Sequence, residues 1–185
     1  EQFDLVFLSL LGSHATATAG AASLDPTYLF TVEGFAALFG RLAPEGLAVF
    51  TTWVENPPRT GVRLAALIID ALRRRGLNEP AQHILALRSW STLTFYVALD
   101  AFPSSAMERL KAFAQEHSFD LVHYPGMKPA EANQINIIPD EPYFAALEAL
   151  AGPAADDFRR RWPFHLTTPS DNAPFFSHHF RWAAV

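Results

Sequence analysis

The chain has 185 residues, a formal net charge of −5 at pH 7, and no cysteine. Half of its residues are hydrophobic, which is typical of a folded domain and excludes wholesale disorder. The lack of cysteine excludes disulfides, thiolate catalysis and cysteine zinc sites, and the acidic balance argues against a nucleic-acid surface. No apolar run approaches the ~18 residues that a membrane-spanning helix needs, so we expect a single domain that does not span a membrane.

The first predicted element is a strand over residues 3–8. The apolar run from Leu5 to Leu8 shows no alternation, which is typical of a strand buried on both faces of a parallel sheet. The residues that follow are small, and small residues let the backbone approach a ligand closely. Because ligands of open α/β sheets lie just beyond the carboxyl ends of the strands, we interpret residues 9–20 as the floor and rim of a binding site.

The next elements complete a βαβ unit. Thr31 is expected to be the N-cap of a helix over residues 31–42, because apolar residues recur at helical spacing in this segment. The sequence Pro44-Glu45-Gly46 ends the helix, and residues 47–54 form a second buried strand. A strand, a helix and a second strand in this order predict two parallel strands joined by a right-handed crossover.

The rest of the chain adds helices, short strands and an irregular tail. A long helix is predicted from Thr60 to its terminator Gly76. Strands over residues 83–87 and 92–99 are expected to form an antiparallel hairpin at the edge of the sheet. Helices are predicted over residues 103–117, 140–150 and 153–161, with a short strand over residues 119–124. Residues 162–182 are rich in aromatic residues and should wrap the body as a packed, irregular segment.

Two arginine clusters stand out against the acidic composition. They occupy residues 73–75 and 159–161, each near the predicted end of a helix. A cation at that position complements the negative end of the helix dipole, and we interpret both clusters in this way. An anion-binding site is the alternative.

Two motifs and the order of the elements resemble a known family. The sequence LAPEGLAVF at residues 42–50 resembles the L-x-P-G-G-x-L turn of Rossmann-like S-adenosylmethionine-dependent transferases. The sequence TPSDNAPFF at residues 168–176 is similar to a T-D-D-x-P-F-F signature. Together they resemble the C-terminal half of the spermidine-synthase-like family, including its bacterial members in which the transferase domain is fused to membrane helices.

This resemblance implies an α/β fold, a partial Rossmann-like transferase fold with a mixed sheet. Residues 1–100 would form the sheet core and residues 101–185 a family-specific extension. The group donor would be S-adenosylmethionine or decarboxylated S-adenosylmethionine, and a methyl or aminopropyl group would pass to a small-molecule acceptor. The implied location is the cytoplasmic side, as a soluble domain of a bacterial inner-membrane protein.

Two departures from the family bear on activity. The glycine-rich turn and the acidic residue that contact the cofactor would precede Glu1, so we expect a part of a longer protein that binds the cofactor weakly or not at all by itself. The two acids of the family's D-S-S-D-P motif fall near Ser9 and Gly12, and neither residue replaces a carboxylate base. Polyamine synthesis by the usual mechanism is therefore not expected. A non-catalytic binding or regulatory module of a membrane protein is the alternative.

The loop after the first strand supplies one group of candidate site residues. By the resemblance, Ser9, Leu10 and Gly12 lie where the cofactor binds. His14 is a candidate general base, because imidazole titrates near neutral pH. The structural alternative for both Ser9 and His14 is a loop residue without a role.

Candidate acceptor-binding residues come from other parts of the chain. Asp25 and Tyr28 lie in a segment that contacts the acceptor in related folds. Trp53 and Glu55 end the second strand, where an aromatic ring can stack on a substrate and a carboxylate can hold an amine, so Glu55 is also a catalytic candidate. Asp171 is interpreted either as a polar group turned into the cleft or as an Asx turn that ties the tail down. Packing and turn roles are the alternatives for the others.

Metal binding and assembly can also be addressed from the sequence. The histidines are scattered and match no metal-binding spacing, so no metal site is predicted. With no strand predicted before it, the strand over residues 3–8 has an open, apolar edge, and such edges invite pairing with another chain. We therefore expect a homodimer, or a swapped assembly, formed through this edge.

Overall fold

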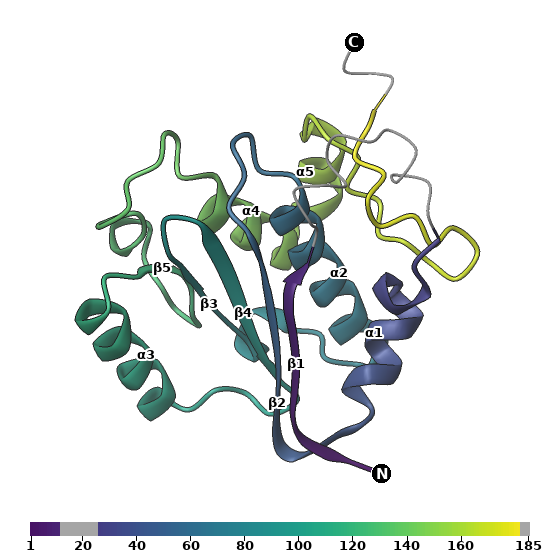
Figure 1. The fold of residues 1–185 in the computed structure, drawn as a ribbon, viewed down its shortest axis with the longest axis horizontal. Helices are drawn as coiled ribbons and strands as arrows, with labels where there is room; N and C mark the ends of the chain where they lie inside the picture. Colours follow the sequence, from purple (N-terminus) through teal and green to yellow (C-terminus); the bar gives the residue numbers. More distant parts are fainter. Residues whose placement is uncertain (12–25, 182–185) are drawn as a thin grey trace.

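The structure of the chain, a computed structural model, describes residues 1–11 and 26–181 (Figure 1). These residues form an α/β fold around a five-stranded mixed sheet, which confirms the predicted class and is compatible with a Rossmann-like fold. The strands are β1 (Phe3–Leu11), β2 (Leu42–Trp53), β3 (Ile84–Arg88), β4 (Thr92–Ala98) and β5 (Asp120–His123). The α-helices are α1 (Val32–Phe39), α2 (Thr60–Arg74), α3 (Ser104–Glu116), α4 (Pro142–Ala151) and α5 (Ala155–Arg161). The candidate site residues Gly12, His14 and Asp25 lie outside the described residues.

β1 and β2 form the parallel pair that the sequence predicts, and α1 joins them. Thr31 is the N-cap of α1, as expected, because its Oγ1 accepts the backbone N–H of Gly34 at 3.0 Å. The carboxyl ends of both strands and the start of α1 therefore lie at the same edge of the sheet (Figure 1).

β2 begins earlier than predicted. The strand starts at Leu42, which pairs with Phe3, and the register shifts before Leu5 pairs further along β2. The turn at residues 44–46 is thus absorbed as an irregularity within the strand instead of preceding it, and Glu45 takes a positive φ of 62° there. The physical reason is that backbone pairing with β1 continues on both sides of the turn.

The antiparallel hairpin of β3 and β4 is present, but its predicted position at the edge of the sheet is wrong. β4 lies between β2 and β3, and β5 pairs with the other side of β3. All five residues of β3 are buried, which suits an interior strand. Because β2 and β3 are both antiparallel to β4, they run in the same direction, and their carboxyl ends lie at one edge of the sheet.

Helices cover the two faces of the sheet unequally. α1, α2 and α4 supply the helical residues of the larger core cluster, in which the rings of Phe35 and Phe39 pack on Phe50 of β2. A smaller cluster joins Leu110 and Ala114 of α3 to residues of β3 on the other face. None of the described helices is both long and apolar enough to cross a membrane.

β1 is not buried on both faces, which corrects the prediction from its apolar run. Val6 and Leu8 pack against the larger core cluster, whereas Leu5 and Phe7 are 58% and 59% exposed. The reason is that the described helices cover the sheet at β1 on one face only. Among the described strands, β1 pairs with β2 alone, so it forms an edge of the sheet.

Residues 162–181 form the packed, irregular tail that the sequence predicts. Leu166 and Phe176 are buried, and the Phe176 ring stacks on Phe30 with the ring centroids 5.0 Å apart. The backbone N–H of Thr27 donates to the carbonyl of Pro174 at 2.8 Å. The tail is therefore attached to the segment that leads into α1.

Candidate functional site

The candidate site lies at the edge of the sheet where β1, β2 and β3 end. α2 also begins at this edge, because it follows β2, and the tail passes the N-termini of α1 and α2 (Figure 1). The N–H groups in the first turn of each helix carry partial positive charge, which favours anionic or polar ligand groups. Strand ends and helix starts of this kind are the parts from which ligand sites of open α/β sheets are built.

Glu55, the predicted catalytic candidate, caps α2. Its Oε2 accepts the backbone N–H groups of Thr60 at 2.6 Å and of Arg59 at 3.2 Å. Its Oε1 lies 3.6 Å from the Arg59 guanidinium, and the Glu55 side chain is 19% exposed. The carboxylate therefore stabilises the start of α2, and both of its oxygens already have partners.

Tyr143 of α4 fixes the end of β2 from the other side. Its hydroxyl lies 3.0 Å from both the backbone N and the backbone O of Glu55, so it accepts from the first and donates to the second. Burial raises the pKa of Tyr143 to about 12, which keeps the hydroxyl protonated at neutral pH. Tyr143 is therefore a positioning residue and not a base. The sequence carries no local signal for this contact, because it joins residues far apart in the chain.

Ser9, Leu10 and Trp53 lie at the ends of adjacent strands. The segment from residue 8 to residue 11 of β1 pairs with residues 50–52 of β2, so Ser9 and Leu10 lie one strand away from Trp53. Ser9 is exposed and Trp53 is half-buried. The structure thus brings these three residues and Glu55 to one edge of the sheet, and their roles in ligand binding stay predictions.

Tyr28 and Asp171 both contact Thr31 at the start of α1. Oδ1 of Asp171 lies 2.6 Å from the Thr31 hydroxyl, which also lies 2.9 Å from the carbonyl of Tyr28. The backbone N–H of Asp171 donates to Oε2 of Glu33 at 3.2 Å. Asp171 thus ties the tail to the start of α1 through contacts with Thr31 and Glu33, and not through the local Asx turn of the structural alternative. Tyr28 is 62% exposed at the same end of α1, so its ring is accessible to a ligand.

Arg63 of α2 holds the tail in place. It is 2% exposed, and its guanidinium donates to the carbonyls of His165 at 3.0 Å, of Phe175 at 3.0 Å and of His178. Burial lowers the pKa of Arg63 to about 10, which leaves it charged at neutral pH. A guanidinium has five N–H donors, so one side chain can bind several carbonyls. The sequence did not single out this residue.

His179 reaches the first residue of α2. Its Nε2 lies 3.4 Å from the hydroxyl of Thr60. Burial and the charges of Arg63 and Arg59 lower the pKa of His179 to about 3, so the imidazole is neutral at physiological pH. In the part of the chain that the structure describes, no three histidine or acidic residues come together as a metal site.

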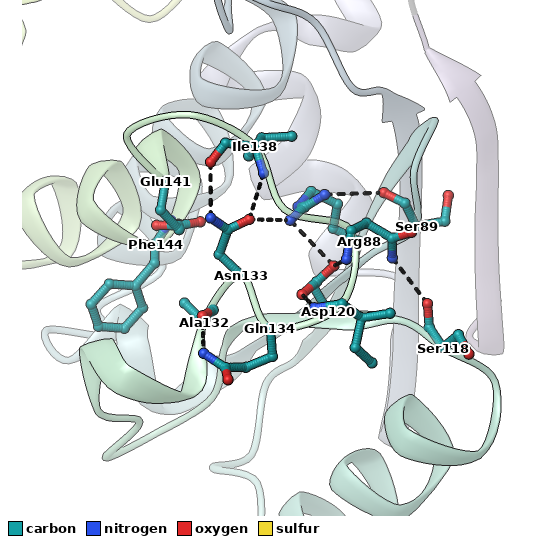
Figure 2. A network of polar contacts seen from close by, with 12 residues as sticks. Arg88, Ser89, Ser118, Asp120, Ala132, Asn133, Gln134, Ile138, Glu141 and Phe144 are labelled. Carbon is teal, nitrogen blue, oxygen red and sulfur yellow. Dashed lines mark hydrogen bonds and ion pairs between the residues drawn. The ribbon is translucent and has the colours of Figure 1, made fainter.

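A buried polar network lies at the carboxyl end of β3, and Figure 2 shows its members. Arg88 and Asp120 form an ion pair at 3.3 Å, and their side chains are 0% and 1% exposed. Nη2 of Arg88 also donates to Oδ1 of Asn133 at 2.9 Å. The Asp120 carboxylate accepts the backbone N–H groups of Ile135 and Asn136 at 2.8 and 2.7 Å. The network therefore fixes the loop between β5 and α4.

The electrostatics of this network are set by its burial. Burial has the largest effect and disfavours the ionised form of Asp120, but the two amide hydrogen bonds and the Arg88 charge together hold its pKa below the usual value. Since its partners are all internal, we assign the network a structural role. It positions the segment that leads into α4, and α4 carries Tyr143.

Comparison with known proteins gives no relative for this chain. No family model matches it, no curated protein is significantly similar to it, and no solved structure matches it. The function is therefore inferred from the order of the sheet and from the side chains at the edge where β1 and β2 end.

Proposed function

We propose that this chain forms the acceptor side of a transferase site that uses S-adenosylmethionine or its decarboxylated form and modifies a small molecule. The observation that supports this most is the β1-α1-β2 unit, whose two parallel strands end beside the N-termini of α1 and α2. Ligands of doubly wound sheets bind in this position. The choice of S-adenosylmethionine or its decarboxylated form as the ligand rests on the resemblance of the two motifs at residues 42–50 and 168–176 to the transferase family.

The residues at this edge suit such a ligand. Trp53 is an aromatic residue at the end of β2, and aromatic rings attract cations as well as stacking on flat bases. Tyr143 and the cap formed by Glu55 hold the end of β2 in place, so Trp53 precedes an ordered segment. Ser9 offers a hydroxyl from the adjacent strand. When bound, the sulfonium compound would supply the alkyl group, while these residues would orient the donor and the acceptor.

A second candidate function is a binding module without catalysis. Ser9 stands where the resembled family has a carboxylate base, and the Glu55 carboxylate is engaged with the amides of Arg59 and Thr60. A serine hydroxyl is not a base near neutral pH, and the oxygens of the Glu55 carboxylate already have partners within the chain, so neither side chain is suited to take a proton. This observation favours a domain that binds the ligand and transmits its presence to the rest of a longer protein.

Nuclear magnetic resonance of the isotope-labelled chain tests the site. We expect S-adenosylmethionine to shift the backbone resonances at the ends of β1 and β2. The dissociation constant should be in the millimolar range, because the proposal assigns only the acceptor side of the site to this chain. Trp53→Ala should abolish these shifts. Phe113→Ala is the matched control, since Phe113 is an aromatic residue 44% exposed on α3, which covers the other face of the sheet. Shifts on another surface, or no shifts at all, would contradict the proposed location of the site. A micromolar dissociation constant would contradict the proposal that this chain supplies only the acceptor side of the site.

The proposed partner of the chain is a second copy that pairs along β1. Among the described strands, β1 has one neighbour, and its exposed edge carries no lysine and no proline. Phe3, Leu5 and Phe7 are 44%, 58% and 59% exposed on this strand. Asp4 is the single charged residue of this strand, and it lies near the start of the strand. A strand edge with exposed apolar side chains invites pairing, and an antiparallel pair of identical strands closes with two-fold symmetry.

Light scattering tests the dimer with a charge placed on the strand. We expect the unaltered chain to be a dimer and Leu5→Lys to be a monomer, because two-fold pairing brings the two lysines near each other in the joined sheet. Ile137→Lys is the control, since Ile137 is an exposed apolar residue outside β1. A monomeric unaltered chain at high concentration would rule out this assembly, as would dissociation by Ile137→Lys alone.

A further inference from the structure

A small cavity lies at the end of α5. It has a volume of about 190 Å³ and is bounded by the last turn of α5, residues 164–167 and the final described residue of the tail. Three of its lining residues are the arginines Arg159, Arg160 and Arg181, and none of the described residues that line it is acidic. Pockets for drug-sized ligands occupy roughly 300 Å³ or more, so this cavity suits a small ion or the charged end of a larger molecule.

The three arginines differ in how far their charges are already compensated. Arg159 donates twice to the carboxylate of Asp70, at 2.8 Å from each oxygen, so its charge is paired and its position is fixed. Arg160 is 69% exposed, and its contact with Asp157 is long, at 3.5 Å. Asp157 also pairs with Arg161 at 3.0 Å. The carboxylate of Asp157 is therefore shared, and the Arg160 guanidinium keeps donors for a ligand.

Arg181 brings a further guanidinium to this cavity from the tail. Its Nη1 donates to the carbonyls of Arg160 and Trp162, the second at 2.9 Å. These contacts hold the side chain against the end of α5 with only part of its five donors in use. The arginines at residues 159–161 can be explained as charges that complement the dipole of α5. This explanation does not account for Arg181, which the tail adds to the same cavity.

His165, which lines the cavity, lies close to these positive charges. His165 packs beside Arg63, with its Nδ1 at 3.4 Å from Nη1 of that residue. Burial, followed by the charges of Arg63, His178 and Arg181, lowers the pKa of His165. The His165 ring is therefore neutral at physiological pH and lies in a region of positive potential.

We propose that this cavity binds an oxyanion, the carboxylate or phosphate group of a small ligand, between the guanidinium groups of Arg160 and Arg181. Guanidinium groups match the planar carboxylate and the phosphate by donating pairs of parallel hydrogen bonds, and these charge-assisted bonds are stronger than neutral ones. The cavity supplies the two partly unused guanidinium groups and a fixed wall at Arg159, and none of the described residues that line it is acidic. The one carboxylate that contacts Arg160, that of Asp157, is shared with Arg161. This oxyanion site is separate from the proposed transferase site, and its test does not depend on that proposal.

The test titrates the unaltered chain with inorganic phosphate, and separately with acetate, at constant ionic strength. Nuclear magnetic resonance follows the ring of His165. We expect at least one of the two ions to shift its resonances saturably and to raise the pKa of His165, because a bound anion offsets the neighbouring cations. Tighter binding of phosphate would identify the ligand as a phosphate ester, and tighter binding of acetate would identify it as a carboxylate.

Two neighbouring substitutions distinguish a site from diffuse surface charge. Arg160→Ala should weaken binding about ten-fold, because it removes charge-assisted hydrogen bonds. Arg161→Ala should leave binding unchanged, since Arg161 is on the same helix, pairs with the same Asp157 and does not line the cavity. Equal weakening by both variants would overturn the proposal, and so would resonances of His165 that neither ion shifts.

Discussion

Substitution of Arg63 by methionine should detach the tail from α2 and lower the free energy of unfolding by about 3–5 kcal/mol. The Arg63 guanidinium donates to three tail carbonyls, those of His165, Phe175 and His178. Methionine fills a similar volume but donates no hydrogen bond, and each buried carbonyl left without a donor costs about 1–3 kcal/mol. Urea unfolding followed by circular dichroism measures the loss.

Limited proteolysis separates release of the tail from general destabilisation. We expect Arg63→Met to be cut rapidly within residues 162–181 while the sheet and its helices stay intact. Arg74→Met is the matched control on the same helix, because Arg74 is 55% exposed and pairs with Glu33 at 3.3 Å. Such surface pairs contribute about 0–1 kcal/mol. Equal losses in the two variants, or a tail that remains resistant in Arg63→Met, would contradict the role of Arg63.

The same substitution should also change the candidate site. The tail carries Asp171 to the start of α1 and His179 to the start of α2. Both contacts depend on the path that the tail takes between them, and Arg63 binds the tail carbonyls along this path. Arg63 therefore connects the stability of the tail with the shape of the edge where β1 and β2 end.

The order and type of the elements could be predicted because their signals are local. Thr31 caps α1 through an amide three residues later, and Gly76 ends the α2 segment with a positive φ of 85°. The hairpin of β3 and β4 follows from two extended segments with a short link. In each case the interaction that decides the structure lies within a few residues, so the sequence pattern is sufficient.

The sheet order and the site contacts could not be predicted because they depend on distant partners. The insertion of β4 beside β2 is decided by packing across the whole sheet, and no turn residue encodes it. The contact between Tyr143 and Glu55 joins α4 to β2, and the ion pair of Arg88 and Asp120 joins β3 to β5. A charged residue within a strand or helix pattern gives no local sign that it is buried and paired.

Substitution of Asp120 by asparagine should cost about 3–5 kcal/mol of stability at neutral pH, because it leaves the buried Arg88 without a countercharge. The asparagine keeps the shape of the side chain, but it turns one acceptor oxygen into a donor. The new NH2 group then faces either the Arg88 guanidinium or a backbone N–H of Ile135 or Asn136. All of these are donors, so the NH2 group cannot form a hydrogen bond with any of them. Urea unfolding at pH 7 measures the effect, and Asp100→Asn is the control, since Asp100 is exposed just after β4.

The same carboxylate gives a pH dependence with a definite sign. The folded-state pKa of Asp120 is below its unfolded value of about 3.9, so its ionised form stabilises the folded chain. This contribution is fully present above the unfolded pKa and is lost as the pH falls through the folded pKa. We expect the stability difference between the unaltered chain and Asp120→Asn to be constant from neutral pH to about pH 5 and to shrink below that. A difference that stays constant down to strongly acidic pH would show that Asp120 is not ionised in the folded chain, and the proposed ion pair with Arg88 would then be wrong.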